Sequence, residues 1–435
     1  MAPRRARALL LSTVCLACAP AEATRRPSRA PAGAPASAPE ARPAFDARAV
    51  WEEFESTLRE AYAYLERDDF SVEDQLHHMR ALALAARDAS ALRSSLHRGG
   101  FAFSDPHLLI GPLTDDDPNV VPTSADLVIE AHGDALRVAD VRLDSPADRA
   151  GIRPGWRLVG VDGAPIEQAV ERVWGGAVLA KTTRQRAYAA TLAANGRRVG
   201  TRALEFEVDA ARRVVELANP REFAKAVAAR ERLTVRRDGA LGYIRIENRL
   251  GDRELIAAFD RALAELHDTR GLVLDLRNTP SGGNTDTARA IIGHFITEIR
   301  AYQIHEIPAV ERATGVPRRF VEQVVPRAPR YPGRVAVLGG RWTGSMGEGL
   351  VIGLHAAAGA RTFTSDMGDL LGALHVFELE RAPIVLEMGA ERLLHVDGTP
   401  REDFVADAPL TSADRDARGD DPALTAARAW LSAPG

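Results

Sequence analysis

Apolar side chains recur every three or four positions early in the chain and in short alternating runs further on. The first recurrence predicts an amphipathic helix over 47–67, with an apolar face made by Trp51, Phe54, Leu58, Tyr62 and Leu65. A second helix is predicted from Val72 to His97, ending at the Gly99–Gly100 pair. Between residues 126 and 172 the pattern changes to short strands, among them 127–130 and 136–141.

From residue 238 onward, apolar strands alternate with helical segments. The strands are expected at 241–247, 271–277 and 334–338, and the helices at 252–267, 285–296 and 347–358. Such alternation is typical of βαβ units, in which helices cover a largely parallel sheet. We therefore predict an α/β fold for this part of the chain. Two further strands, near 202–207 and 213–217, are expected around a turn.

Composition narrows the class of protein. The chain has 435 residues, of which 46% are hydrophobic and 27% are charged, which is globular composition and enough for two or three domains. The net charge of -4 gives no basic excess, so we expect no nucleic-acid partner. Lysine occurs only at Lys181 and Lys225. Both cysteines, Cys15 and Cys18, lie close to the N-terminus, which leaves no disulfide or thiol chemistry for the rest of the chain.

The N-terminal segment is typical of an export signal. Arginines at positions 4, 5 and 7 precede an apolar stretch over 8–17, which is too short to span a bilayer. Residues 14–18 resemble a bacterial lipobox, in which Cys18 would be lipidated; a cleaved, soluble exported form is the alternative. We read 1–18 as the signal peptide and the Ala/Pro-rich stretch 19–43 as a linker. The expected location is the bacterial cell envelope.

Two glycine-rich loops follow predicted strands, at 278–284 and 339–349. The carboxyl ends of parallel strands are where open α/β sheets build their sites. Ser345 would begin a helix, where a hydroxyl is exposed and developing negative charge is favoured, so it is a candidate nucleophile. The amides of Met346 and of Gly282 or Gly283 are candidates for an oxyanion hole. Two alternatives remain: Ser345 as a simple helix cap beside tight turns, or a phosphate cradle that lacks the P-loop lysine.

The sequence Leu272 to Arg277 with its Gly-Gly loop, followed by Ser345-Met-Gly-Glu348, resembles the tail-specific (C-terminal-processing) serine peptidases. The segment that contains Ser-Pro-Ala at 145–147 and Asp-Gly at 162–163 resembles a bacterial PDZ domain. The resemblance covers roughly 45–432. It implies a crotonase/ClpP-like protease core with an inserted PDZ-like domain. The expected parts are an N-terminal helical part at 44–112, a PDZ-like domain at 125–175, a connecting segment at 176–235 and a peptidase core at 236–432.

The identity of the general base follows from the resemblance and the missing lysines. One branch of the family pairs its serine with a lysine some twenty residues later, but no lysine follows Lys225, and arginine does not act as a base. The tricorn-like and retinoid-binding-protein-like branch uses a histidine and a glutamate. His107 and Glu402 fall where these residues would stand. Ser104 or Asp105 are alternatives to Glu402 for orienting the imidazole.

His375 and His395 follow Ser345 in the chain, as the catalytic histidine does in α/β-hydrolases. Residue 343 is threonine, however, where that elbow needs glycine, which disfavours both of them as the base.

These observations lead to one hypothesis and two rivals. The hypothesis is a serine-type endopeptidase that hydrolyses polypeptide substrates, needs no metal or organic cofactor, and touches the membrane only through a possible lipid anchor. The first rival is a catalytically inactive, PDZ-containing peptide-binding protein. The second is a hydrolase of small esters or amides.

Overall fold

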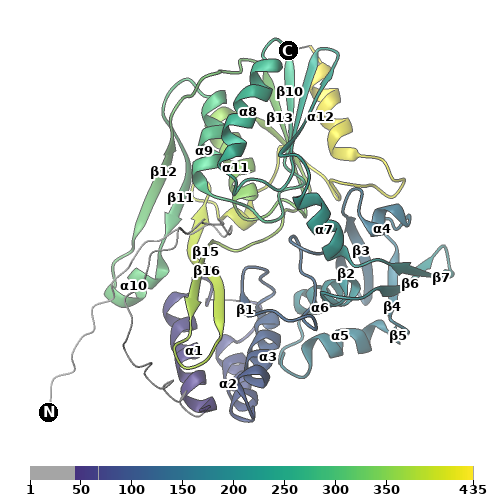
Figure 1. The fold of residues 1–435 in the computed structure, drawn as a ribbon, viewed down its shortest axis with the longest axis vertical. Helices are drawn as coiled ribbons and strands as arrows, with labels where there is room; N and C mark the ends of the chain where they lie inside the picture. The colour runs from purple at the N-terminus through teal and green to yellow at the C-terminus, as the bar shows by residue number, and fades with distance from the viewer. Residues whose placement is uncertain (1–44, 67, 435) are drawn as a thin grey trace, which may run out of the picture. The chain divides into compact units, whose positions relative to one another are not determined.

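The computed structural model describes residues 45–66 and 68–434. The predicted signal peptide, Cys18 and the linker over 19–43 lie outside these residues. The described part contains three sheets and their covering helices (Figure 1). None of its helices combines the length and the apolar character that crossing a membrane requires.

The N-terminal part is helical. It contains α1 (Ala47–Ala61), α2 (Val72–Leu84), α3 (Ala89–Gly100) and the single turn η1 (Phe101–Phe103). The single helix that we expected over 72–97 is therefore two helices. Asp88 causes the break, because its side chain accepts a hydrogen bond from the Ala91 amide and caps α3. The strand β1 (Leu109–Gly111) follows this helical part.

A second unit is built on a six-stranded sheet in the order β2-β3-β4-β6-β7, with β5 beside β4. We call it the inserted sheet. Its strands are β2 (Leu127–His132), β3 (Ala135–Val141), β4 (Arg157–Val161), β5 (Ala164–Pro165), β6 (Arg202–Val208) and β7 (Ala211–Leu217). Its helices are α4 (Pro146–Arg149), α5 (Ile166–Trp174) and α6 (Thr183–Asn195). Because β6 pairs with β4, this sheet extends to Leu217, well into the stretch 176–235 that we expected to be a connecting segment.

The α/β sheet that was predicted from residue 238 onward is confirmed. Its order is β17-β14-β13-β10-β9-β8, with parallel pairing from β9 to β17 and an antiparallel edge at β8. The strands are β8 (Leu233–Asp238), β9 (Leu241–Ile246), β10 (Gly271–Asp275), β13 (Arg334–Gly339), β14 (Arg361–Thr364) and β17 (Ala408–Pro409). The helices are α7 (Pro220–Ala228), α8 (Glu254–Glu265), α9 (Thr285–Ile292), α11 (Met346–Ala358) and α12 (Pro422–Ser432), with the short turns η2 (Gly293–Phe295) and η3 (Arg401–Asp403).

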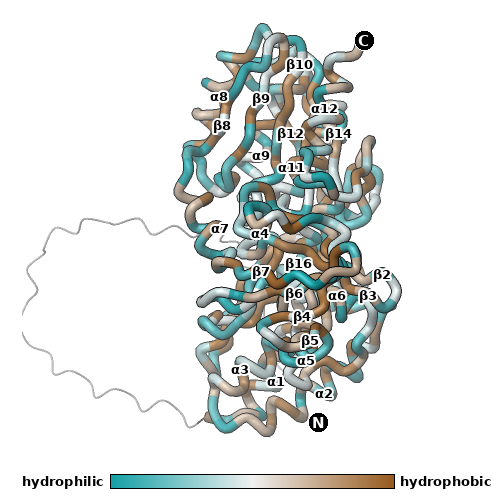
Figure 2. Tube along the Cα trace, turned by 90° about the vertical axis from the view of Figure 1, so that its right-hand side faces the viewer, coloured by the Kyte–Doolittle hydropathy of each residue, from teal (hydrophilic) through white to brown (hydrophobic). Residues whose placement is uncertain are grey.

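Alternate residues of the central strands pack on opposite faces of this sheet, as the strand period requires. Leu272 and Leu274 of β10 belong to a cluster with residues of α8, α9 and α11, whereas Val273 packs with residues of α12. Figure 1 shows α12 and these three helices on opposite sides of β10 and β13. The apolar run of β10 is brown in Figure 2. Both faces of the sheet are therefore buried, which leaves its strand ends for a site.

A third sheet joins the N-terminal part to the core. It contains β11 (Arg300–Glu306), β12 (Arg319–Val324), β15 (Ala373–Glu378) and β16 (Val385–Leu394), with α10 (Pro308–Thr314) between β11 and β12. Strand β16 pairs with both β1 and β15. This pairing places the residues just before β1 close to the residues just before β15, although more than 250 positions separate them in the sequence.

Candidate active site

Ser345 stands at the carboxyl end of β13, immediately before α11, with a strained backbone. Its φ of 51° and ψ of -115° lie outside the regions that a residue with a side chain normally adopts. Such strain persists only where the surrounding structure imposes it, and it concentrates at functional sites. The amide of Ser345 donates a hydrogen bond of 2.6 Å to the Glu348 carboxylate, one turn into α11. This hydrogen bond to the first turn of α11 therefore fixes the sharp turn at Ser345.

The loop after β10 lies against Ser345. A Cβ atom on Gly282 would stand 2.6 Å from the Ser345 Cβ and 3.0 Å from the Met346 nitrogen, so only glycine leaves this space open. The Met346 amide is the first of α11 and has no hydrogen-bond acceptor among the residues that the structure describes. The amide of Gly282, in contrast, donates to the Thr279 carbonyl at 3.1 Å. The amide of Gly282 is therefore already engaged, and Met346 provides the free donor.

Gly283, the other candidate donor, packs on a different neighbour. A Cβ atom there would lie 2.2 Å from the carbonyl carbon of Leu250, which explains why the second residue of the pair is also glycine. The loop is fixed further by Asn248. Its side chain accepts from the Ser281 amide at 3.0 Å and donates to the Ser281 hydroxyl at 3.2 Å.

His107 lies two residues before β1 and is buried, with 6% of its surface exposed. Its Nδ1 is 3.1 Å from the carbonyl oxygen of Leu371, and because a carbonyl only accepts, Nδ1 carries the proton and Nε2 holds the lone pair. Burial, aided by the positive charge of Arg401, lowers the pKa of His107 to about 3, so the ring is neutral at physiological pH. No hydrogen bond joins His107 to Ser345 in the described part of the chain.

Asp105 and Tyr62 set the position of His107. One carboxylate oxygen of Asp105 accepts from the backbone amides of His107, at 2.9 Å, and of Leu371, at 3.4 Å, while the other accepts from the Tyr62 hydroxyl at 2.8 Å. Asp105 thus ties the loop before β1 to the segment before β15. It acts on the backbone of His107, which only partly matches our alternative that Asp105 orients the imidazole.

Glu402 lies in η3 and makes no hydrogen bond to His107 among the described residues. Burial raises the pKa of Glu402, and its charge acts on Tyr64. Its neighbour Arg401 enters the site instead. The buried guanidinium of Arg401 donates to the carbonyl oxygens of Leu370, of Gly372 at 3.3 Å and of Ser345 at 3.3 Å. One side chain therefore touches both the nucleophile loop and the segment that holds His107.

Glu348 is a second ionisable group at the site, beside Arg401. Its carboxylate accepts from the amides of Ser345 and Asp369, and it lies 3.7 Å from the Arg401 guanidinium. Burial raises the pKa of Glu348 to about 8, although Arg401 opposes this. The spacing Ser345-x-x-Glu348 is that of a capping box, a signal from which the contact with Ser345 could have been predicted. Nothing in the sequence singled out Arg401.

His375 and His395 lie away from this arrangement. His375 lies on β15, and its Nε2 atom is 3.1 Å from the carboxylate of Glu391 on β16. The Nε2 atom of His395 lies 3.4 Å from Nδ1 of His355. Neither contacts Ser345 in the part of the chain that the structure describes. No group of three or more His, Cys, Asp or Glu side chains within these residues is arranged to hold a metal ion.

One family model matches part of this chain. The model of "Peptidase family S41" matches residues 240–369, which include the Gly282 loop and Ser345 but neither His107 nor Glu402. No curated protein sequence matches the chain.

Several solved structures share the fold. Mature CPAF is 13% identical with a TM-score of 0.55 over 88% of this chain and 95% of that one. The photosystem II D1 C-terminal processing protease is 17% identical with a TM-score of 0.52, over 84% and 93%. A putative peptidase from Parabacteroides merdae is 14% identical with a TM-score of 0.50, over 89% and 98%. Residues 240–369 therefore match the peptidase family S41 model, and the chain shares the fold of these structures, which together support a serine-type hydrolase.

Proposed function

We propose that the protein is an endopeptidase in which Ser345 is the nucleophile. The observation that carries this is the strained backbone of Ser345 at the start of α11, with the free Met346 amide beside it and the bare Cα of Gly282 opposite. A helix cap has no need of such strain, and a phosphate cradle of the P-loop type would need a lysine that this loop lacks. The arrangement suits attack on a carbonyl carbon, because the Met346 amide can donate to the oxygen that becomes negative.

His107 is the proposed general base. With Nδ1 donating to Leu371, the lone pair on Nε2 is available to take the proton of the Ser345 hydroxyl as the new C–O bond forms. His107 then gives that proton to the leaving amine as the C–N bond breaks, which leaves an acyl-enzyme. A water molecule, deprotonated by the same nitrogen, releases the new carboxylate and restores Ser345. Catalytic hydrogen bonds are often long before substrate binds, and we place the contact between His107 and Ser345 in the substrate complex.

Orientation of the base falls to the carbonyl oxygen of Leu371 rather than to a carboxylate on Nδ1. The carboxyl of Glu402 does not reach His107. Because its neighbour Arg401 does reach the site, Glu402 stays a candidate for a role when substrate is bound. Met346 is the first oxyanion donor. Gly283 is the candidate for the second, because Gly282 already donates to Thr279.

The substrates are proposed to be polypeptides of the cell envelope. This rests on the predicted export signal and on the resemblance of residues 14–18 to a lipobox, in which Cys18 would be lipidated. The test is cleavage of an unfolded protein such as reduced, alkylated casein by the purified wild type and by Ser345→Ala. Loss of cleavage in the variant supports the proposal. Equal cleavage by both proteins would exclude Ser345 as nucleophile, and turnover of a short ester without any cleavage of casein would favour the small-ester hydrolase.

A further inference from the structure

Strand β2 is one of the two edge strands of the inserted sheet, and it is the edge where we would expect an extended peptide to add to a PDZ-like domain. The outward main-chain groups of Leu127 and Ile129 in this strand are already occupied by α6. The Asn195 side chain accepts from the amides of Asp126, at 2.8 Å, and Leu127, at 3.1 Å, and donates to the Leu127 carbonyl at 2.8 Å. The Thr191 hydroxyl accepts from the Ile129 amide at 2.9 Å and donates to the Ile129 carbonyl at 3.1 Å. Side chains of α6 thus make the hydrogen bonds that a bound peptide would need.

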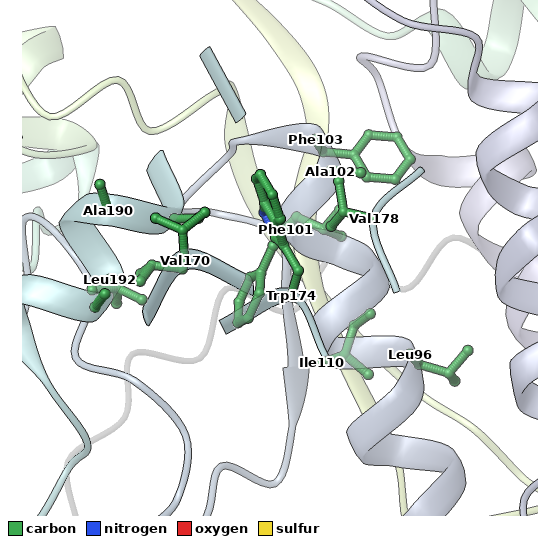
Figure 3. Packing of buried hydrophobic residues seen from close by; sticks show 14 of the residues in the cluster. Leu96, Phe101, Ala102, Phe103, Ile110, Val170, Trp174, Val178, Ala190 and Leu192 are labelled. Carbon is green, nitrogen blue, oxygen red and sulfur yellow. The ribbon is translucent and has the colours of Figure 1, made fainter. Parts of the chain in front are cut away.

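Helix α6 is held in this place from its other side. Ala190 and Leu192 are buried in one cluster with Val170 and Trp174 of α5 and with Phe101 of η1 (Figure 3). In addition, the buried amide of Gln185, near the start of α6, donates to the carbonyl of Ala102 at 2.8 Å. Because α6 belongs to the main core of this part of the chain, lifting it from β2 would expose a large apolar surface.

The side chains of β2 that alternate with Leu127 and Ile129 contact the loop before Ser345. Val128 belongs to a small apolar cluster with Trp342, which is fully buried and donates from Nε1 to the Ala125 carbonyl at 2.9 Å. Glu130 forms an ion pair with Arg341. Arg341 also pairs with Asp366 at 2.8 Å, on the segment that leads to Leu370.

We propose that the inserted sheet does not capture peptides at β2 and instead positions the nucleophile loop, with Glu130 as a positioning residue that acts on Ser345 through Arg341. The first part stands on the hydrogen bonds of α6 alone, whereas the second rests on the proposed function of Ser345. Substrate selection then belongs to the peptidase core. This excludes the peptide-receptor rival as far as it depends on strand addition to β2.

The first experiment tests whether β2 can bind a peptide, and it does not depend on catalysis. Hydrogen–deuterium exchange of the Ser345→Ala protein is measured with and without a ten-residue unstructured peptide that ends in a free valine carboxylate, and with its amidated form. We expect the exchange of the amides at 127–129 to be the same in all samples. Protection of these amides by the carboxylate form alone would overturn the proposal.

The second experiment tests positioning. Glu130→Gln keeps the size of the side chain but removes the charge that pairs with Arg341. We expect kcat on casein and the labelling rate by a fluorophosphonate probe to fall by roughly three- to tenfold with KM unchanged, and Glu130→Asp to recover part of the loss. The matched control is Glu207→Gln, which breaks a half-exposed ion pair with Arg157 in the same sheet, far from this loop in sequence and contacts.

The outcomes separate the two proposals. A normal labelling rate in Glu130→Gln, or a raised KM at constant kcat, would overturn the positioning role. Failure of the wild type to react with the probe would instead refute the proposed function, while the exchange experiment would still decide whether β2 is closed to peptides.

Discussion

Gly282 faces Ser345 so closely that a single added methyl group would lie 2.6 Å from the Ser345 Cβ. The two residues lie in loops that follow the neighbouring parallel strands β10 and β13, and both loops leave the sheet at the carboxyl ends of these strands. The backbone of Gly282 also has a φ of +61°, which disfavours any side chain. Gly282 is therefore required twice, once by its conformation and once by the space in front of the Met346 amide.

Gly282→Ala is predicted to reduce both stability and activity. The left-handed backbone costs about 1–2 kcal/mol for alanine, and the new methyl group displaces Ser345, so we expect kcat to fall at least about a hundredfold. The matched control is Gly133→Ala, whose φ is +60° but whose added Cβ meets no atom within 4 Å. It shares the backbone cost without touching the site. Thermal unfolding and casein cleavage would measure both effects, and equal activity of the two variants would contradict this role of Gly282.

His107→Gln is predicted to lower kcat by about 10²–10⁴-fold, the usual contribution of a general base. The pH dependence is the sharper test. Because burial lowers the pKa of His107 to about 3, the ring stays neutral down to about that pH, and kcat/KM should show no acid limb near 6.5. A profile that falls below a midpoint near 6.5, and loses this limb in an active variant of His107, would show that the imidazole is charged and exposed in the free enzyme.

Arg401→Met is predicted to destabilise the protein and to disorganise the site. It leaves Glu348 without its only cationic neighbour within 4 Å in the described residues, and it removes three hydrogen bonds to backbone carbonyls. Above about pH 8, where Glu348 is ionised, loss of one partner of this buried ion pair costs about 3–5 kcal/mol. Double substitution with Glu348→Gln should recover part of this cost, because it removes the unpaired carboxyl. Chemical denaturation of the two single variants and the double variant measures the coupling, and strictly additive effects would contradict it.

His305 provides a stability test away from the active site. Burial opposes its charging, but hydrogen bonds to Glu322 and Glu391 outweigh this and raise the pKa of His305 to about 8. A raised pKa stabilises the folded state fully below the unfolded value of about 6.5, and this contribution disappears as the pH rises through 8. His305→Gln should therefore cost about 1–2 kcal/mol at pH 6 and markedly less at pH 9. Denaturation at both pH values measures the difference, and a cost independent of pH would refute the assignment.

The sequence allowed prediction of the parts of the fold that have strong local signals. The alternation of apolar strands with helices from residue 238 predicted the parallel sheet, and the two loops at its strand ends predicted the meeting of Gly282 with Ser345. The break between α2 and α3 was missed because the apolar period continues across it while Asp88 caps the second helix. The third sheet was missed because its pairings, such as β1 with β16, join segments that are far apart in the chain.

The candidate site was also only partly predictable, because contacts between distant segments leave no local signal in the sequence. The approach of His107 to Leu371 depends on two strands that both pair with β16, and no local pattern reports that. Arg401 was missed because its role depends on hydrogen bonds to three carbonyl groups on two other segments. The contact of Glu348 with Ser345, in contrast, could have been predicted from the capping-box spacing. Gly282 was one of two glycines predicted as an oxyanion donor, and the sequence could not show that the tight turn engages its amide with the Thr279 carbonyl.

The central claim is that Ser345 is an activated nucleophile, and the most direct measurement is covalent labelling with a fluorophosphonate followed by mapping of the modified peptide. We predict a single modification on Ser345 of the native protein, with none on the unfolded protein or on Ser345→Ala. Native protein that stays unlabelled, or that carries the label on another residue while Ser345→Ala is labelled as well, would contradict the account.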